Sequence, residues 1–153
     1  MTKFVYRMQN VLDLKLKLEE QAKIAFSLAN NKLREEEARL QRIYDGIHIY
    51  ENKLKKFRNG RLNLLEMKRC SEAIKIKKEQ AEAQKKEIKI AERNVEIARK
   101  KLNDVMVERK TQEILREKAF DEYKKEFDKE ENKVTDELVS YRYNGNGKET
   151  DNA

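Results

Sequence analysis

Residues 54–67 read LKKFRNGRLNLLEM, and the pair Asn59-Gly60 at their centre separates two long helical patterns. Asn-Gly pairs favour turns, because both residues accept backbone conformations that end a helix. A single helix that continued through the pair would next place polar residues, among them Arg61 and Lys68, on its apolar stripe. The stripe would end there, so the sequence predicts a hairpin that reverses direction at Asn59-Gly60.

Each side of this turn carries a stripe of mostly apolar residues that advances alternately by four and by three positions. A repeat of about 3.5 residues is typical of a coiled coil, in which two such stripes pack along a shared seam. The residue numbers of facing positions, such as Leu54 with Met67 and Phe26 with Val95, have a constant sum, as antiparallel helices of one chain require. The first stripe comprises Ala22, Phe26, Ala29, Leu33, Glu36, Leu40, Ile43, Ile47, Tyr50, Leu54 and Phe57. The second comprises Met67, Cys70, Ile74, Lys77, Ala81, Gln84, Ile88, Ala91, Val95, Ala98, Leu102 and Val105.

We therefore predict an all-α fold, an elongated antiparallel two-helix coiled-coil hairpin with a longer second helix. Helix one is expected over about 4–57, the turn over 58–61 and helix two over about 62–141. Together these form a single helical hairpin over 1–143. The polar, Gly- and Asn-rich tail 144–153 is expected to be disordered.

Four positions along the helices are unusual. Glu36 and Gln84 are expected to face each other in the one seam layer that has no apolar member. Cys70 lies on the second stripe, where a lone cysteine is expected to be a small buried packing residue. Gly46 lies inside helix one, where glycine costs about 1 kcal/mol relative to alanine, and it is expected to mark a local bend.

The composition also favours long helices. Charged residues make up 42% of the 153 residues, and the chain has neither Pro nor Trp. A disordered charged chain is the alternative, but disorder does not explain two stripes in register. We expect neither a membrane span nor a signal peptide, because no apolar run has the required length.

The sequence contains no arrangement typical of an enzyme. A two-helix seam encloses no pocket, and the single histidine, His48, lies on a different helix from the single cysteine, Cys70. We therefore predict a protein that is not an enzyme, with no catalytic residue, no cofactor and no metal site. His48 is expected to be an exposed helix residue.

Helix two extends past the N-terminus in this register, so nothing in helix one lies opposite it beyond about Phe120. An unpaired amphipathic helix is either a docking surface or a site of self-association. Aromatic side chains are enriched at interfaces, which favours docking to a different protein. The apolar stripe of this overhang comprises Phe120, Tyr123, Phe127, Val134, Leu138 and Tyr141.

Charge is distributed unevenly along the chain. Basic residues outnumber acidic ones from Lys53 to Lys110, and the reverse holds from Asp121 to Ser140. A basic half can meet acidic proteins, membrane headgroups or nucleic acid. Lys and Arg alternate with Glu, however, and no aromatic platform for bases accompanies them. A solvated coiled-coil surface is therefore the simpler interpretation.

Two segments of the chain resemble the FliJ family, small cytoplasmic proteins of the bacterial flagellar type III export apparatus. Residues 4–15 read FVYRMQNVLDLK, an aromatic followed by Met-Gln and a Val-Leu-Asp-Leu run. The C-terminal segment begins with EILREK at 113–118. It continues with Tyr123, Glu126, Glu131, Asp136-Glu137-Leu138 and Arg142.

The resemblance implies a non-enzymatic stalk that binds the flagellar export ATPase and promotes assembly of its hexameric ring. It also implies contacts with the membrane-embedded export gate and with substrate chaperones, at the inner face of the cell membrane at the flagellar base. We expect a cytoplasmic, peripherally membrane-associated monomer that binds no nucleic acid. A homo-oligomeric structural coiled coil and a basic nucleic-acid-binding helical protein remain alternatives.

The resemblance and the unpaired stripe together suggest which residues make these contacts. The expected ATPase-binding residues are Phe120, Tyr123, Phe127, Val134 and Leu138. The expected gate- or chaperone-binding residues are Tyr44, Ile49 and Ile76, which lie off both stripes.

Overall fold

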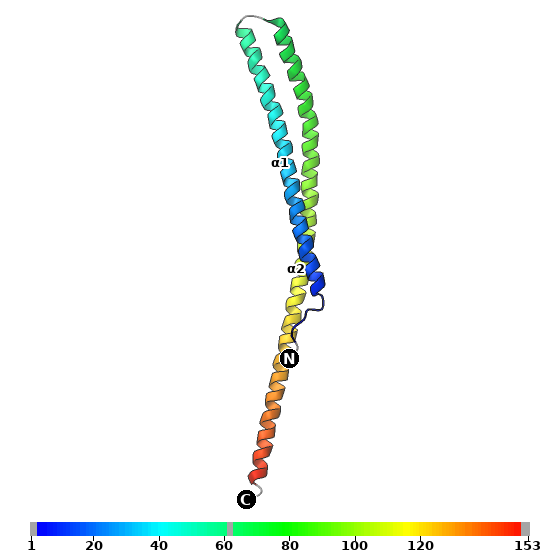
Figure 1. Ribbon diagram of the computed structural model, residues 1–153, viewed down its shortest axis with the longest axis vertical. Helices are drawn as coiled ribbons and strands as arrows, with labels where there is room; N and C mark the ends of the chain where they lie inside the picture. Colours follow the sequence, from blue (N-terminus) through cyan, green and yellow to red (C-terminus); the bar gives the residue numbers. More distant parts are fainter. Residues whose placement is uncertain (1–2, 61–62, 151–153) are drawn as a thin grey trace. The chain divides into compact units, whose positions relative to one another are not determined.

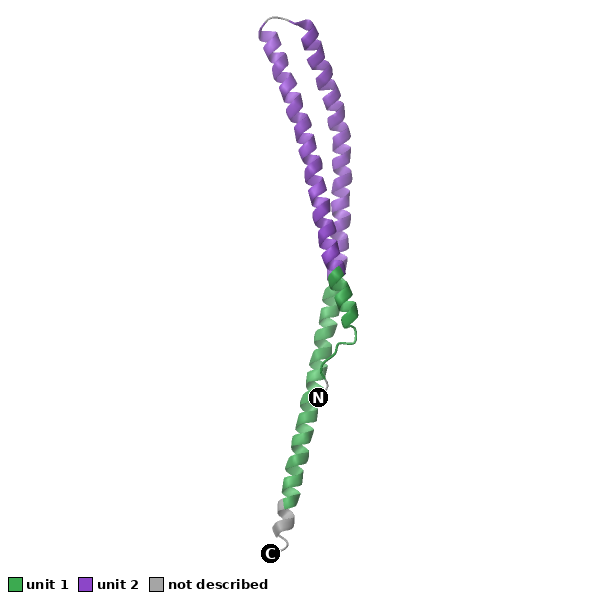
Figure 2. Ribbon diagram, viewed as in Figure 1, with its two compact units in different colours: residues 1–17, 107–153 green, residues 18–106 purple. Residues whose placement is uncertain are grey.

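The computed structural model describes residues 3–60 and 63–150, with side chains up to Gly145. Two helices, α1 (Gln9–Asn59) and α2 (Leu64–Thr150), make up almost all of this described chain, which contains no strand (Figure 1). The predicted all-α fold is therefore confirmed. Both helices contribute to each of two compact units (Figure 2). We call Leu18–Met106 the hairpin unit, and Met1–Lys17 with Val107–Ala153 the terminal unit.

Within the hairpin unit, α1 and α2 run antiparallel and side by side (Figure 1). Every position of the two predicted stripes is buried or half-buried, whereas most positions between them are exposed. The most buried apolar residues of this seam include Ile47, Cys70, Ala81 and Ala91. Cys70 is thus the buried packing residue that the sequence predicts. The core of the unit is a single seam, as in a two-stranded coiled coil.

At the turn of the hairpin unit, α1 ends at Asn59 and α2 begins at Leu64. The backbone N–H of Glu66 donates to the side-chain oxygen of Asn63 at 3.3 Å, so Asn63 caps α2. The predicted turn at 58–61 begins inside the last helical turn of α1, and 61–62 lie outside the described residues.

In the terminal unit, α1 begins at Gln9, although the sequence predicts a start near Phe4. Residues 3–6 are not helical, and the Gln9 N–H donates to the Tyr6 carbonyl at 3.1 Å where the helix begins. An extended chain advances about 3.3 Å per residue, compared with about 1.5 Å in a helix. The segment therefore reaches further along α2 than a helix of the same length would.

The end of α2 also differs from the predicted boundary. The sequence places that end near Tyr141 and a disordered tail over 144–153, but α2 continues to Thr150. No proline interrupts this stretch, and its backbone hydrogen bonds can form without a partner. Residues 151–153 lie outside the described part of the chain. Fraying of this unsupported end in solution stays a prediction.

Candidate partner-binding surfaces

Four aromatic side chains of the terminal unit form a contiguous group, which we call the aromatic cluster. The Phe4 ring lies 5.2 Å from the Phe120 ring, edge to face, and 5.4 Å from the Tyr123 ring. Tyr123 in turn stacks on Phe127, with 6.4 Å between the ring centroids. The prediction that Phe120 and Tyr123 have no intramolecular partner is therefore wrong. That prediction assumed that helix one starts near Phe4. A helical N-terminal segment would be too short to reach Tyr123.

Polar contacts hold the N-terminal segment and the start of α1 on α2. The buried Tyr6 hydroxyl donates to the Gln112 side-chain oxygen at 2.9 Å. The Arg116 guanidinium donates to the Gln9 side-chain oxygen at 3.0 Å and lies 6.0 Å from the Phe4 ring centroid. These contacts supplement the apolar packing of this unit, in which Tyr6 and Leu12 are buried.

Burial alternates along this non-helical segment of the structure. Val5 is 78% exposed, whereas its neighbour Tyr6 is only 9% exposed and Phe4 is half-buried. This alternation with a period of two residues is typical of extended chain, because successive side chains point to opposite sides. The sequence itself does not show this alternation, because Phe4, Val5 and Tyr6 are all apolar.

Beyond the aromatic cluster, α2 presents a second apolar surface, which we call the C-terminal stripe: Val134, Leu138 and Tyr141. Their spacing of four and three residues places them on one face of the helix. All three are exposed, as is every other described side chain from Asp128 to Gly145. A shallow groove lined by Phe127 and Val134, among others, connects the cluster with the stripe. This part of the predicted overhang therefore lacks a packing partner within the described chain.

The three residues predicted for the gate or for chaperones do not share one exposed face of the hairpin unit. Tyr44 is half-buried. The pKa of Lys85 is raised, chiefly by the Glu82 carboxylate and next by the Tyr44 hydroxyl. Ile49 and Ile76 are both exposed.

Heptad geometry explains this separation. Tyr44 and Lys85 each follow a seam residue by one position, whereas Ile49 and Ile76 each follow one by two positions. In an antiparallel pair, equivalent flanking positions of the two helices lie on the same side of the seam. Ile49 and Ile76 therefore share one flank, and Tyr44 lies on the other.

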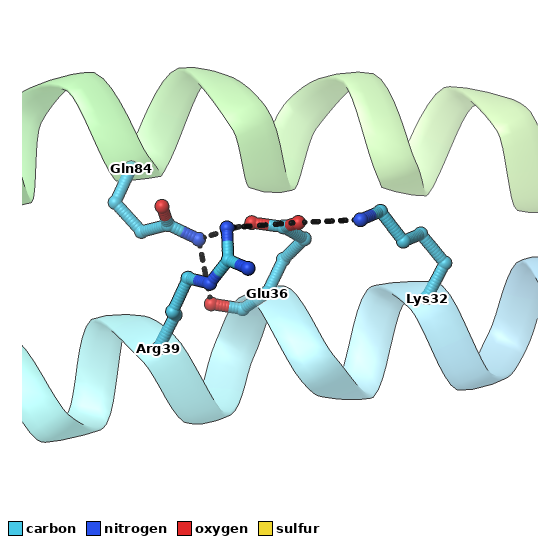
Figure 3. A network of polar contacts seen from close by, with 4 residues as sticks. All are labelled: Lys32, Glu36, Arg39 and Gln84. Carbon is cyan, nitrogen blue, oxygen red and sulfur yellow. Dashed lines mark hydrogen bonds and ion pairs between the residues drawn. The ribbon is translucent and has the colours of Figure 1, made fainter.

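The polar seam layer predicted at Glu36 and Gln84 is present. The Gln84 amide donates to the Glu36 carboxylate and, at 2.9 Å, to the Glu36 backbone carbonyl (Figure 3). Lys32 and Arg39 lie 3.1 Å and 3.8 Å from the same carboxylate. The hydrogen bond from Gln84, followed by that from Lys32, holds the pKa of Glu36 below its usual value.

The described residues contain no group of three or more His, Cys, Asp or Glu side chains that is arranged to hold a metal ion. His48 is exposed, as predicted, and its ring lies 3.4 Å from the carboxylate of Glu51 on the next turn of α1. None of the described helices has an apolar stretch that is long enough to span a membrane.

In a comparison with protein families, a family model described as flagellar FliJ protein matches residues 3–148, which cover α1, nearly all of α2 and both candidate surfaces. Neither a curated protein nor a solved structure matches the chain.

Proposed function

Because the chain belongs to the family of flagellar FliJ proteins, we propose that it binds the flagellar export ATPase and promotes assembly and activity of the ATPase ring. Membership in this family makes the chain a component of the flagellar export apparatus. In this proposal the protein acts by binding, without catalysis of its own, as a cytoplasmic monomer at the inner face of the membrane. It links the ATPase to the export gate and to substrate chaperones.

The C-terminal stripe is the observation that carries the proposed ATPase contact. Val134, Leu138 and Tyr141 are exposed on a part of α2 against which no other described segment packs. Apolar side chains at helical spacing on a free helix face are typical of helix-in-groove recognition. Acidic residues outnumber basic ones from Asp121 to Ser140, so the partner groove is expected to have a basic rim.

The aromatic cluster has a different role in this proposal. Phe120 and Tyr123 pack against Phe4, so part of each ring surface is covered within the protein itself. The cluster fixes the N-terminal segment on α2, and Phe127 continues from it toward the stripe through the shared groove. The ATPase would then contact the stripe directly, together with the exposed edges of Phe120 and Phe127.

The gate or chaperone contact is proposed for the hairpin unit. Of the three residues suggested by the sequence, Ile49 and Ile76 are exposed on the same flank and are the stronger candidates. Tyr44 is half-buried and lies on the other flank, so its ring is less available to a partner.

The test uses the purified full chain and the export ATPase. The variant Val134→Ser/Leu138→Ser is expected to bind the ATPase at least about 30-fold more weakly, because a truncated apolar anchor typically loses about 2 kcal/mol. Stimulation of ATP hydrolysis and ring assembly should fall in parallel. Helix content should not change, because both side chains are exposed.

The matched control is Val107→Ser/Ile114→Ser, which changes two equally exposed apolar residues of α2 within the same unit. It should bind and stimulate normally. Equal loss in both variants, or none in the stripe variant, would refute a contact at the stripe. Light scattering that gave a dimer or larger species would favour the structural coiled coil instead.

A further inference from the structure

The turn end of the hairpin unit combines positive charge with exposed aliphatic side chains. Six basic residues lie within a few helical turns of the turn, and all six are exposed. We call them the basic collar: Lys53, Lys55, Lys56, Arg58, Lys68 and Arg69. The one acidic residue among the described residues 53–69 is Glu66, which pairs with Arg69 at 3.2 Å. The collar is therefore strongly cationic.

Structural roles account for only part of this charge. Lys56 and Arg58 lie in the last turn of α1, where cations stabilise the helix dipole. Among the described residues, no ion pair engages Lys55, Lys56, Arg58 or Lys68. Neither an ion pair nor the helix dipole therefore accounts for Lys55 and Lys68 in the described chain.

The first two residues of α2 are leucines whose side chains are unusually exposed. Leu64 is 76% exposed and Leu65 is 60% exposed, and neither belongs to the seam. An α-helix turns by about 100° per residue, so these neighbours point in clearly different directions. One narrow groove on a partner protein cannot hold both side chains, whereas a fluid hydrocarbon boundary can.

The side chains of the basic collar also point in different directions around the helices. Lys55, Lys56 and Arg58 point in three different directions around α1, and Lys68 and Arg69 add two more on α2. Positive charge therefore surrounds the turn end on several sides. A partner protein that docked on one flank would contact only some of these positive charges. A planar anionic surface that met the hairpin end-on would contact all of them.

We propose that this turn end, consisting of Leu64, Leu65 and the basic collar, binds to bilayers that contain anionic lipids. The lysines and arginines attract the lipid phosphates, and the leucines enter the boundary between headgroups and acyl chains. This contact goes beyond the proposed ATPase contact, and it uses the hairpin unit where the ATPase contact uses the terminal unit.

A tryptophan reporter tests insertion directly, because the chain contains no tryptophan of its own. The full-length variant Leu65→Trp should show a blue shift of its emission with vesicles of phosphatidylcholine and phosphatidylglycerol, and none with phosphatidylcholine alone. Ile97→Trp, at an exposed position of α2 far from the turn, should show no shift with either vesicle. An unchanged spectrum of Leu65→Trp with the anionic vesicles would overturn the proposal.

Vesicle sedimentation tests the collar and the leucines separately. Lys55→Gln/Lys56→Gln/Lys68→Gln should lower the partition coefficient on the order of 100-fold, at about fivefold for each charge. The control Lys86→Gln/Lys89→Gln/Lys100→Gln removes the same charge several Debye lengths away and should have little effect. Leu64→Ser/Leu65→Ser should weaken binding, whereas Ile90→Ser/Ile97→Ser should not. Equal effects of a variant and its control would overturn the proposal.

Two further measurements separate this proposal from its competitors. The collar and leucine variants should stimulate the ATPase normally. A failure of vesicle binding would therefore leave the proposed ATPase contact intact, and a failure of the ATPase contact would leave the membrane proposal intact. If the wild-type protein bound polyglutamate but not the anionic vesicles, the collar would be a site for an acidic protein and the membrane proposal would be wrong.

Discussion

The side-chain amide of Gln84 on α2 bonds to both the carboxylate and the backbone carbonyl of Glu36 on α1 (Figure 3). This pair forms the polar layer of an otherwise mostly apolar seam, and it helps to fix the register of the hairpin unit. A slip of one heptad would place Glu36 against Ala91 in one direction and Gln84 against Ala29 in the other. Either slip buries a polar group without its partner, which is unfavourable.

The paired arrangement predicts opposite effects for single and double substitutions. Gln84→Leu alone leaves the Glu36 carboxylate facing an apolar side chain, so the melting temperature should fall. Glu36→Leu/Gln84→Leu replaces the whole layer with apolar side chains, so the melting temperature should rise above that of the wild type. Circular dichroism melting curves measure both. A double variant that melted no higher than the wild type would argue against burial of this layer.

The pKa of Glu36 predicts a dependence of stability on pH. Gln84 and Lys32 hold this pKa below its usual value, so the carboxyl binds its proton less readily in the folded protein than in the unfolded chain. The resulting stabilisation is complete above the unfolded-state pKa and is lost as the pH falls through the folded-state pKa. Urea midpoints at about pH 7 and about pH 3 should therefore differ more for the wild type than for Glu36→Gln. An equal difference between the two pH values in both proteins would show that the fold does not stabilise the ionised form of Glu36.

The fold of the hairpin unit could be predicted from the sequence because one physical rule governs it. Apolar residues at heptad spacing must pack against a matching stripe, and the turn at Asn59-Gly60 selects the register that pairs Phe26 with Val95. The same rule placed Glu36 opposite Gln84, because a polar layer is as clear a marker as an apolar one. Burial of every predicted seam position follows from this periodicity.

The path of the N-terminal segment could not be predicted in the same way, because residues 3–6 are not helical and lie outside the heptad. Phe4 reaches Tyr123 through this segment, whose residues Phe4, Val5 and Tyr6 are all apolar, so the sequence does not show which of them face α2. The start of α1 is set by tertiary contact of Phe4 and Tyr6 with α2, which overrides the helical propensity of the segment. The sequence groups Tyr44, Ile49 and Ile76 because all three lie off the stripes, but the rotation of the helix places Tyr44 on the other flank.

Gly46 offers a direct way to stabilise the hairpin unit. A Cβ at this position would lie 3.0 Å from Nζ and 3.1 Å from Cε of Lys77, the mobile end of a long side chain that can move aside. Gly46→Ala should then gain about 1 kcal/mol of helix stability and raise the melting temperature by about 2–4 °C. Gly46→Val is the contrast, because its branched side chain approaches the Lys77 stem and has lower helix propensity. A lower melting temperature for Gly46→Ala would mean that Lys77 is held firmly, for instance over the Tyr50 ring at 6.0 Å.

The aromatic cluster predicts that Phe4 holds the N-terminal segment in place. Phe4→Ala removes two ring contacts, each worth about 1 kcal/mol, and should release the segment without melting the hairpin unit. Trypsin should then cleave after the exposed Arg7 at least about fivefold faster, because cleavage requires the segment to detach. Val5→Ala, at a position that points to solvent, should be cleaved at the wild-type rate. Equal cleavage rates for all three proteins would mean that Phe4 is not what holds the segment.

The flank shared by Ile49 and Ile76 predicts the outcome of a binding experiment with the cytoplasmic part of the export gate and with substrate chaperones. Ile49→Ser/Ile76→Ser should weaken binding of one of these partners by at least about tenfold, since each side chain is exposed and free to become an interface anchor. Tyr44→Phe removes only a hydroxyl on the other flank, so it should leave binding unchanged. Titration calorimetry on the purified proteins measures both, and circular dichroism should show wild-type helix content throughout. If Tyr44→Phe weakened binding and the isoleucine variant did not, the partner would contact the flank that carries Tyr44 and Lys85.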